Sequence, residues 1–200
     1  MLGDDNVGYP NNWKPSTEFY IGDDRFRYKL GTAGNNVLIC FGVNPSTATE
    51  DKPDAAMRQL IKVCQKFGYD SYIMLNPCPI RSSSPDKLPT EETFAESFQK
   101  NMEYIEEVFA KYPGATALAS WGNAIDSRLY LKNAVCKIYA TSKKYNIQWN
   151  HYSSMTQKGH PRHLLLRDFS QAQREQALLE PLDMERYTDS LNLQSVDNAN

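Results

Sequence analysis

The N-terminal part of the chain has a pattern of apolar and polar positions that is typical of a β-hairpin. Residues 18–21 and 25–30 are two short strand-like runs, the second one alternating, and Gly22-Asp23-Asp24 lies between them. Residues 37–41 then form a continuous apolar run, which is typical of a strand buried on both faces. The pattern predicts a hairpin followed by a central strand.

Further along, helical and strand-like patterns alternate. We expect helices near residues 54–67, 90–112, 123–140 and 171–179, and strands at 71–75, 115–121 and 147–152. Strand–helix–strand repetition implies parallel strands joined by right-handed crossovers. The predicted fold is therefore α/β, a three-layer α/β/α sandwich around a central four-stranded parallel sheet, with an N-terminal β-hairpin.

The composition fits one globular domain with polar ends. The chain has 200 residues, of which 40% are hydrophobic and 12% aromatic. Residues 1–16 are rich in Asn, Gly and Pro and are expected to form a flexible arm. Residues 17–180 should form the single domain, and residues 181–200 an acidic, disordered tail, because negative charge dominates the C-terminal part of the chain.

Several features indicate a cytoplasmic protein. The longest apolar run, residues 37–43, is too short to cross a bilayer, and the acidic N-terminus lacks the apolar region of a secretory signal. We expect a monomer without membrane contact. The cysteines lie far apart along the chain, form no CxxC motif and follow no secretory signal, so we expect reduced thiols instead of disulfides. The cysteines are Cys40, Cys64, Cys78 and Cys136.

The loops that follow the strands are the expected site, since ligands of such sheets bind beyond the carboxyl ends of the strands. Carboxylates are scarce there, with Asp51 and Asp54 the nearest, which argues against a paired-carboxylate glycosidase and against a Mg²⁺ site. No third ligand accompanies the two histidines, so no metal and no cofactor are expected. The polar residues on these loops are Asn44, Asn76, Asn123, Cys78, His160, His163, Arg81 and Arg162.

Four of these strand ends carry a resemblance. Residues 42–45 (GVNP), 75–77 (LNP), 120–122 (SWG) and 160–165 (HPRHLL) resemble, in order, the motifs of the mismatch-directed branch of the uracil-DNA glycosylase superfamily. That branch has G-[IV]-N-P after its first parallel strand and H-P-S-P-L in its last motif. The spacing from NPSTA through Arg58 to GHPRH is also similar to a bacterial family known only as domain of unknown function 1643.

The resemblance implies roles for particular residues. Asn44 would orient a water molecule at the sugar carbon, and Asn76 would read a flipped base. The last motif lacks its second proline, so the catalytic histidine, a donor to the departing base, is either His160 or His163. The further base contacts expected are Gly42, Ser46 and Trp121. The expected phosphate and wedge contacts are Arg81, Ser82, Ser83, Lys158, Arg162 and Leu164.

The predicted function is that of a monofunctional DNA glycosylase, with DNA as its partner. The small residues 46–48 leave room for a 5-substituted pyrimidine, so modified cytosine in phage DNA, and hence antiviral defence, becomes a hypothesis. Two alternatives stay open. One is a hydrolase with Cys78 as nucleophile and His163 as base. The other is a module of the same fold that binds nucleotides or nucleic acid without catalysis. Independently of these alternatives, a purely structural interpretation of two residues also stays open, in which Asn44 caps a turn and Trp121 belongs to the core.

Overall fold

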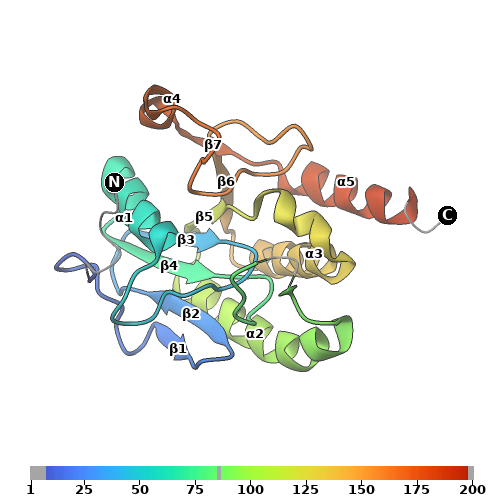
Figure 1. Ribbon diagram of the computed structural model, residues 1–200, viewed down its shortest axis with the longest axis horizontal. Helices are drawn as coiled ribbons and strands as arrows, with labels where there is room; N and C mark the ends of the chain where they lie inside the picture. The colour runs from blue at the N-terminus through green and yellow to red at the C-terminus, as the bar shows by residue number, and fades with distance from the viewer. Residues whose placement is uncertain (1–7, 85–86, 198–200) are drawn as a thin grey trace.

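The computed structural model describes residues 8–84 and 87–197 as an α/β protein built on one mixed sheet (Figure 1). The seven strands are β1 (Tyr20–Gly22), β2 (Arg27–Gly31), β3 (Val37–Phe41), β4 (Ser71–Leu75), β5 (Thr116–Ala119), β6 (Gln148–Tyr152) and β7 (Leu179–Pro181). The helices are α1 (Ala55–Phe67), α2 (Glu91–Lys111), the 3₁₀ helix η2 (Gly122–Ser127), α3 (Leu129–Lys143), α4 (Gln171–Gln176) and α5 (Met184–Asp197). The predicted α/β class is confirmed.

The sheet is larger than the sequence predicted, and it is mixed. Its order is β1-β2-β4-β3-β5-β6-β7, and neighbouring strands from β4 to β6 run parallel. The predicted hairpin of β1 and β2 exists, but it joins the sheet where β2 pairs antiparallel with β4. At the other end β7 pairs antiparallel with β6. Both additions give hydrogen-bond partners to strand edges that would otherwise stay open.

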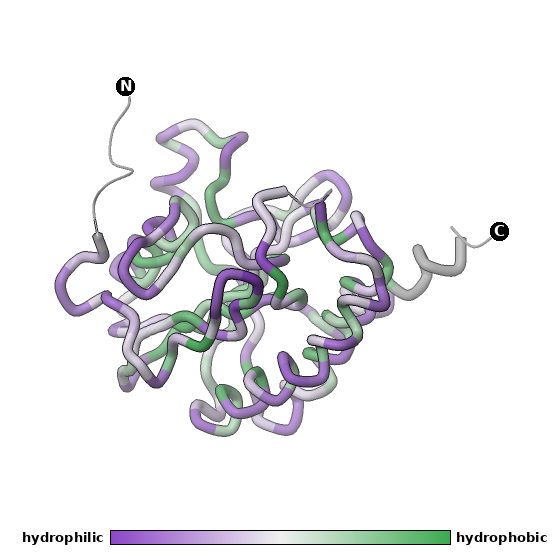
Figure 2. Tube along the Cα trace, turned by 60° about the horizontal axis from the view of Figure 1, so that its bottom comes forward, coloured by the Kyte–Doolittle hydropathy of each residue, from purple (hydrophilic) through white to green (hydrophobic). Residues whose placement is uncertain are grey.

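Side chains of β3 alternate between two apolar clusters, one on each face of the sheet. Leu38 and Cys40 belong to the cluster that contains the buried residues of α1. Ile39 and Phe41 belong to the cluster that contains those of α2 and α3. Figure 2 shows the apolar stretches in the interior and the polar ones along outer helices and loops. Helices therefore cover both faces of the sheet.

The helix after β3 has the boundaries that its sequence predicts. Asp54 precedes it as N-cap, and its Oδ1 accepts a hydrogen bond from the backbone N–H of Met57 at 2.9 Å. Gly68 ends it with φ of 76°, a left-handed conformation that glycine adopts without steric cost. Asp54 is thus held at the start of α1, facing the ends of the parallel strands.

Both terminal segments differ from the prediction where they are described. The expected arm packs on the domain from residue 8 on: the ring of Trp13 stacks on Tyr72, and the Tyr72 hydroxyl donates to its carbonyl at 3.0 Å. The segment expected to form a disordered tail contains α5, whose buried Met184, Tyr187 and Leu191 follow helical spacing and join the main core. Residues 1–7 and 198–200 lie outside the described part.

The strand order positions the site. β3 lies between β4 and β5, so the chain crosses from β3 to β4 and then returns over β3 to β5. At such a reversal the loops leave neighbouring parallel strands in opposite directions and open a crevice at the carboxyl ends. The residues that follow β3, β4 and β5 therefore surround one space.

Candidate active site

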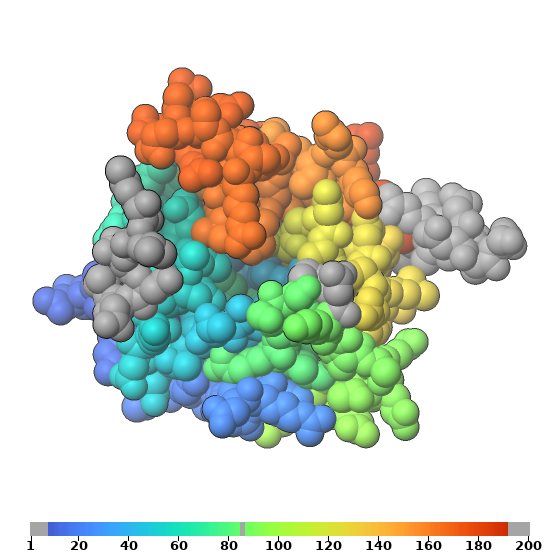
Figure 3. All heavy atoms as spheres, in the orientation of Figure 1, coloured from blue at the N-terminus to red at the C-terminus, as the bar shows by residue number. Residues whose placement is uncertain are grey.

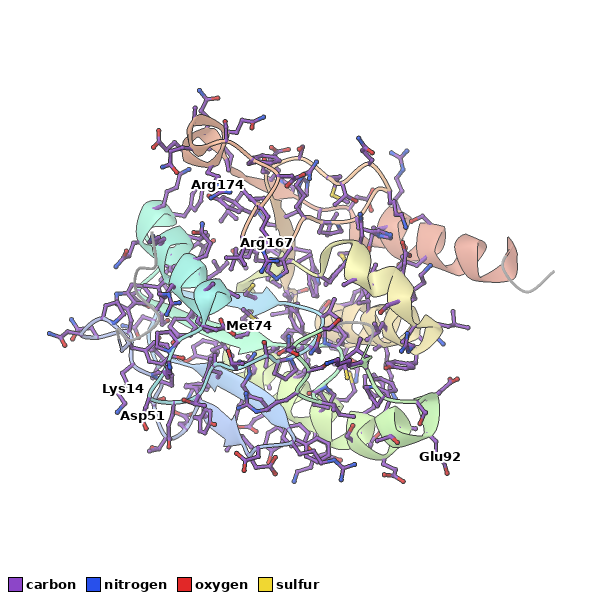
Figure 4. All side chains as sticks on the ribbon, viewed as in Figure 1. Lys14, Asp51, Met74, Glu92, Arg167 and Arg174 are labelled. Atoms are coloured by element: carbon purple, nitrogen blue, oxygen red, sulfur yellow. The ribbon has the colours of Figure 1, made fainter. Side chains whose placement is uncertain are left out.

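A cavity of about 1090 Å³ occupies that crevice. In Figure 3 the surface is hollowed between the segment that precedes α4 (orange) and the η2–α3 segment (yellow). In Figure 4 two labelled lining residues, Met74 and Arg167, lie near the middle of this face, between α1 and α3. Ligand pockets typically measure roughly 300–1,000 Å³, so the space is large enough for a small-molecule-sized ligand.

Ten of the thirteen site residues predicted from the sequence line this cavity. They are Gly42, Asn44, Ser46, Asn76, Ser82, Ser83, Trp121, Arg162, His163 and Leu164. His160, Arg81 and Lys158 are absent from the lining.

Asn44 follows β3 and has one fixed orientation. Its Nδ2 donates to the backbone carbonyl oxygens of Pro45 and Ser82, both at 2.9 Å. Because both partners are acceptors, the amide must present its NH₂ group to them. Its Oδ1 has no hydrogen-bond partner within residues 8–84 and 87–197 and remains available in the cavity.

Asn76 follows β4 and is buried, with 1% of its surface exposed. Its Oδ1 accepts a hydrogen bond from Nη2 of Arg27 at 3.1 Å, and its backbone carbonyl accepts one from Nδ2 of Asn101 at 2.8 Å. The Nδ2 group lies against Gly42, where a Cβ would come within 3.1 Å of it. Because Gly42 has no side chain, there is space beside it for the Nδ2 group of Asn76, and this donor group borders the cavity.

His163 is the histidine that lies in the cavity. Its Nδ1 accepts a hydrogen bond from the backbone N–H of Leu165 at 3.2 Å, so its neutral form carries the proton on Nε2. The ring is exposed to the cavity, whose walls desolvate it, and this desolvation together with the charge of Arg167 lowers the pKa of His163. A neutral imidazole with a free Nε2–H donor results.

His160 lies in a buried network instead. Its Nδ1 is 3.0 Å from the hydroxyl of Tyr187, and its Nε2 is 3.1 Å from Oδ2 of Asp126. Burial lowers the pKa of His160, against the opposing effect of the Asp126 carboxylate. The sequence left both histidines as catalytic candidates. In the structure His163 lines the cavity, whereas His160 lies outside its lining.

Trp121 connects that network to the cavity. Its indole Nε1–H donates to the Tyr187 hydroxyl at 2.7 Å, and its ring packs at 6.1 Å from Trp149 in the core. Gly122 follows with φ of 59°, donates its N–H to the carbonyl of Pro161 at 2.9 Å, and lies against His163. The core interpretation of Trp121 is therefore confirmed, although one part of its surface lines the cavity.

Two of the expected phosphate contacts, Arg81 and Lys158, lie outside the cavity lining. Arg81 donates to the backbone carbonyls of Asp23, Ser46 and Ala48 at 2.7–3.0 Å, so its guanidinium holds loops together. Nζ of Lys158 lies 3.5 Å from Oδ2 of Asp126. Arg162 does line the cavity; it pairs with Asp168 and stacks over Phe169.

Four of the five basic residues that line the cavity were not among the site residues predicted from the sequence. The five basic residues of the lining outnumber its two carboxylates, Asp54 and Asp168, so the cavity favours an anionic ligand. Arg167 belongs to a basic run that was visible in the sequence, but Arg27 lies in a strand whose alternation did not reveal which side faces the site. The five are Arg27, Lys52, Arg58, Arg162 and Arg167.

Cys78 does not fit the thiol alternative. It is fully buried outside the cavity lining, and burial raises the pKa of its thiol to about 11. A nucleophilic cysteine needs an accessible thiolate at neutral pH. Within residues 8–84 and 87–197, no group of three or more His, Cys, Asp or Glu side chains could hold a metal ion.

These features define an α/β protein with a polar, positively charged cavity at the carboxyl ends of its parallel strands. A family model described as "Protein of unknown function (DUF1643)" matches residues 27–165, and the chain belongs to that family. Neither a curated protein nor a solved structure matches the chain. None of the described helices is both long and apolar enough to cross a membrane.

Proposed function

We propose that the protein is a monofunctional DNA glycosylase that hydrolyses the N-glycosidic bond of a flipped pyrimidine. The observation that carries the proposal is the fixed Asn44 amide, whose free carbonyl oxygen shares one cavity with the Nε2–H donor of His163 and with Asn76. The proposal includes a monomeric, cytoplasmic protein and a three-layer fold with four parallel strands at its centre.

The chemistry follows from these groups. The Oδ1 of Asn44 accepts a hydrogen bond from a water molecule and directs its oxygen at the sugar carbon. His163 donates to an oxygen of the departing base, and one such donor supplies about 3–4 kcal/mol of stabilisation to a developing anion. Asn76 donates to the edge of the base. An amide is a weak base, so water is positioned here and not deprotonated, and turnover is slow.

The substrate that we propose is a base with a substituent at its 5-position. Ser46 and Thr47 line the cavity next to Asn44, and neither side chain is large enough to fill it. Modified cytosine in phage DNA is the corresponding candidate, with defence as the setting. Arg162 and Arg167, together with the cationic face of the cavity, are the proposed phosphate contacts.

The experiment is a screen of oligonucleotides that carry uracil, thymine opposite guanine, 5-hydroxymethylcytosine or its glucosylated form, with alkali to cleave abasic sites. Asn44→Ala should reduce base release by at least about 100-fold, since loss of positioning alone has effects of that order. Asn133→Ala, on the exposed surface of α3, is the matched control and should behave as the wild type. Binding without release from any oligonucleotide would refute the glycosylase and favour the binding module.

A further inference from the structure

Strand β2 carries two buried cations, and only one of them is neutralised. Lys29 is 2.9 Å from the carboxylate of Glu107, and its ammonium group lies over the rings of Phe19 and Tyr104. Arg27, with 3% of its surface exposed, forms no ion pair within the described residues. A buried charge is costly unless it is paired, so the lack of an ion-pair partner for Arg27 requires an explanation.

The guanidinium of Arg27 is also short of hydrogen bonds. Its Nη2 donates to Oδ1 of Asn76, whereas Nε and Nη1 are buried and have no partner in residues 8–84 and 87–197. Burial lowers the pKa of Arg27 to about 10, which still leaves it a cation at neutral pH. The negative charge of Asp54 raises the pKa of Arg27 and so opposes the effect of burial, although the two side chains form no hydrogen bond.

Arg27 lines the cavity, beside the amide of Asn76 that borders Gly42. Unsatisfied buried donors are rare in folded proteins, and those that persist in a cavity are candidate ligand contacts. Arg27 and Asn76, joined by this hydrogen bond, therefore lie next to each other in the cavity wall on which the base is proposed to rest.

We propose that Arg27 is a catalytic residue, whose guanidinium donates to the base and stabilises the negative charge that develops on it as the glycosidic bond breaks. This inference rests on the proposed function and assigns to Arg27 a role that the sequence resemblance gave to a histidine alone. Charge-assisted hydrogen bonds are about twice as strong as neutral ones. The cation is held in a buried environment, where its field is screened least.

The step balances without proton transfer from Arg27. The bond between the sugar carbon C1′ and the ring nitrogen of the base breaks, and its electron pair stays on the base, delocalised onto the ring oxygens. The oxygen of water forms a bond to C1′ and releases a proton to solvent, and the base anion takes up a proton from solvent. Arg27 remains protonated throughout and acts by its charge.

The first experiment compares base release by the wild type, Arg27→Lys and Arg27→Met across leaving bases of decreasing acidity: 5-fluorouracil, uracil and thymine. Arg27→Met should lose at least about 100-fold in rate and depend more steeply on leaving-base acidity. Arg27→Lys, which keeps the charge, should lose less. Arg25→Met, an exposed arginine of the same hairpin, is the control and should match the wild type. Thermal melting verifies that each variant folds.

The second experiment needs no catalysis. The acidic, coloured base 5-nitrouracil is titrated with pH in the presence of each protein, and the pKa of the bound base is followed by absorbance. The wild type should lower that pKa by about one unit or more relative to Arg27→Met, a tenfold preference for the anion. Equal values in both proteins, or no binding of the base to the wild type, would overturn the inference. Arg27-dependent anion binding without base release from any oligonucleotide would refute the glycosylase while Arg27 kept its anion-binding role.

Discussion

Replacing Tyr187 with Phe should disrupt a directional hydrogen-bond chain behind the cavity. The Tyr187 oxygen accepts the indole proton of Trp121, so its own proton goes to Nδ1 of His160. His160 is then neutral with its proton on Nε2, which donates to Asp126. One hydroxyl on α5 therefore determines the tautomer of a histidine in the loop before α4.

The magnitude follows from the two groups that lose their partner. Removing the hydroxyl leaves the indole N–H of Trp121 and Nδ1 of His160 buried and unsatisfied, and each such group costs about 1–3 kcal/mol. The phenyl ring keeps its packing, so Tyr187→Phe should destabilise the fold by about 2–6 kcal/mol. At this chain length about 1 kcal/mol corresponds to roughly 2–4 °C, so Tm should fall by on the order of 4–24 °C.

Urea denaturation and thermal melting measure the effect. The control is Tyr139→Phe, because the Tyr139 hydroxyl has no hydrogen-bond partner within the described residues, and its change should stay within about 0.5 kcal/mol. A Tyr187→Phe protein as stable as this control would refute the hydrogen-bond chain.

A pH series gives a second measure of the same substitution. Burial lowers the pKa of His160 in the folded state, so the unfolded chain binds a proton that the native protein does not. Wild-type stability should therefore be complete above the unfolded pKa of about 6.5 and fall as the pH decreases from there towards the folded value. Without the Tyr187 hydroxyl, Nδ1 of His160 can take up a proton at less cost, so the decrease should be shallower. An unchanged slope would contradict the assigned tautomer.

Three further predictions concern the cavity. Gly42→Ala should weaken base release more than stability, because the new Cβ would lie 3.1 Å from Nδ2 of Asn76 and displace that amide; equal base release in the two proteins would contradict the assigned contact. Cys78→Ser should release base at a rate within about twofold of the wild type, since its thiol lies outside the cavity lining, whereas loss of all turnover would restore the thiol mechanism. Arg167→Gln should reduce the salt dependence of DNA binding by about one unit of slope, as measured by fluorescence anisotropy, and Lys111→Gln, on the far helix α2, should leave that slope unchanged.

The sequence was sufficient to predict the centre of the fold, and most of the site residues that it suggested line the cavity. The apolar run of β3 and the repeated strand–helix pattern place parallel strands in the middle, and the rule for their carboxyl ends selects Asn44, Asn76 and His163. These inferences rely on local periodicity and on a general property of α/β sheets, both of which are visible without a structure.

What the sequence could not predict depends on partners that are distant along the chain. Arg27 is buried because it meets Asn76, 49 residues away, and alternation in a hairpin does not say which set of side chains faces the sheet neighbour. The choice between His160 and His163 depends on Tyr187 in α5, a segment whose acidic composition suggested disorder. Its three buried side chains, spaced for one helix face, were the available indication of a packed helix.

The carboxylates of the cavity determine what kind of hydrolysis this site could perform. Asp54 caps α1 through the Met57 amide, and Asp168 is paired with Arg162, so both acidic residues of the lining already serve as structural acceptors. Asn44 accepts hydrogen bonds without taking a proton. In the proposed glycosylase, the larger catalytic contribution is therefore expected in stabilising the leaving group. Arg27 and His163 are the residues that we propose for that role, with a substrate whose bond breaks before water attacks.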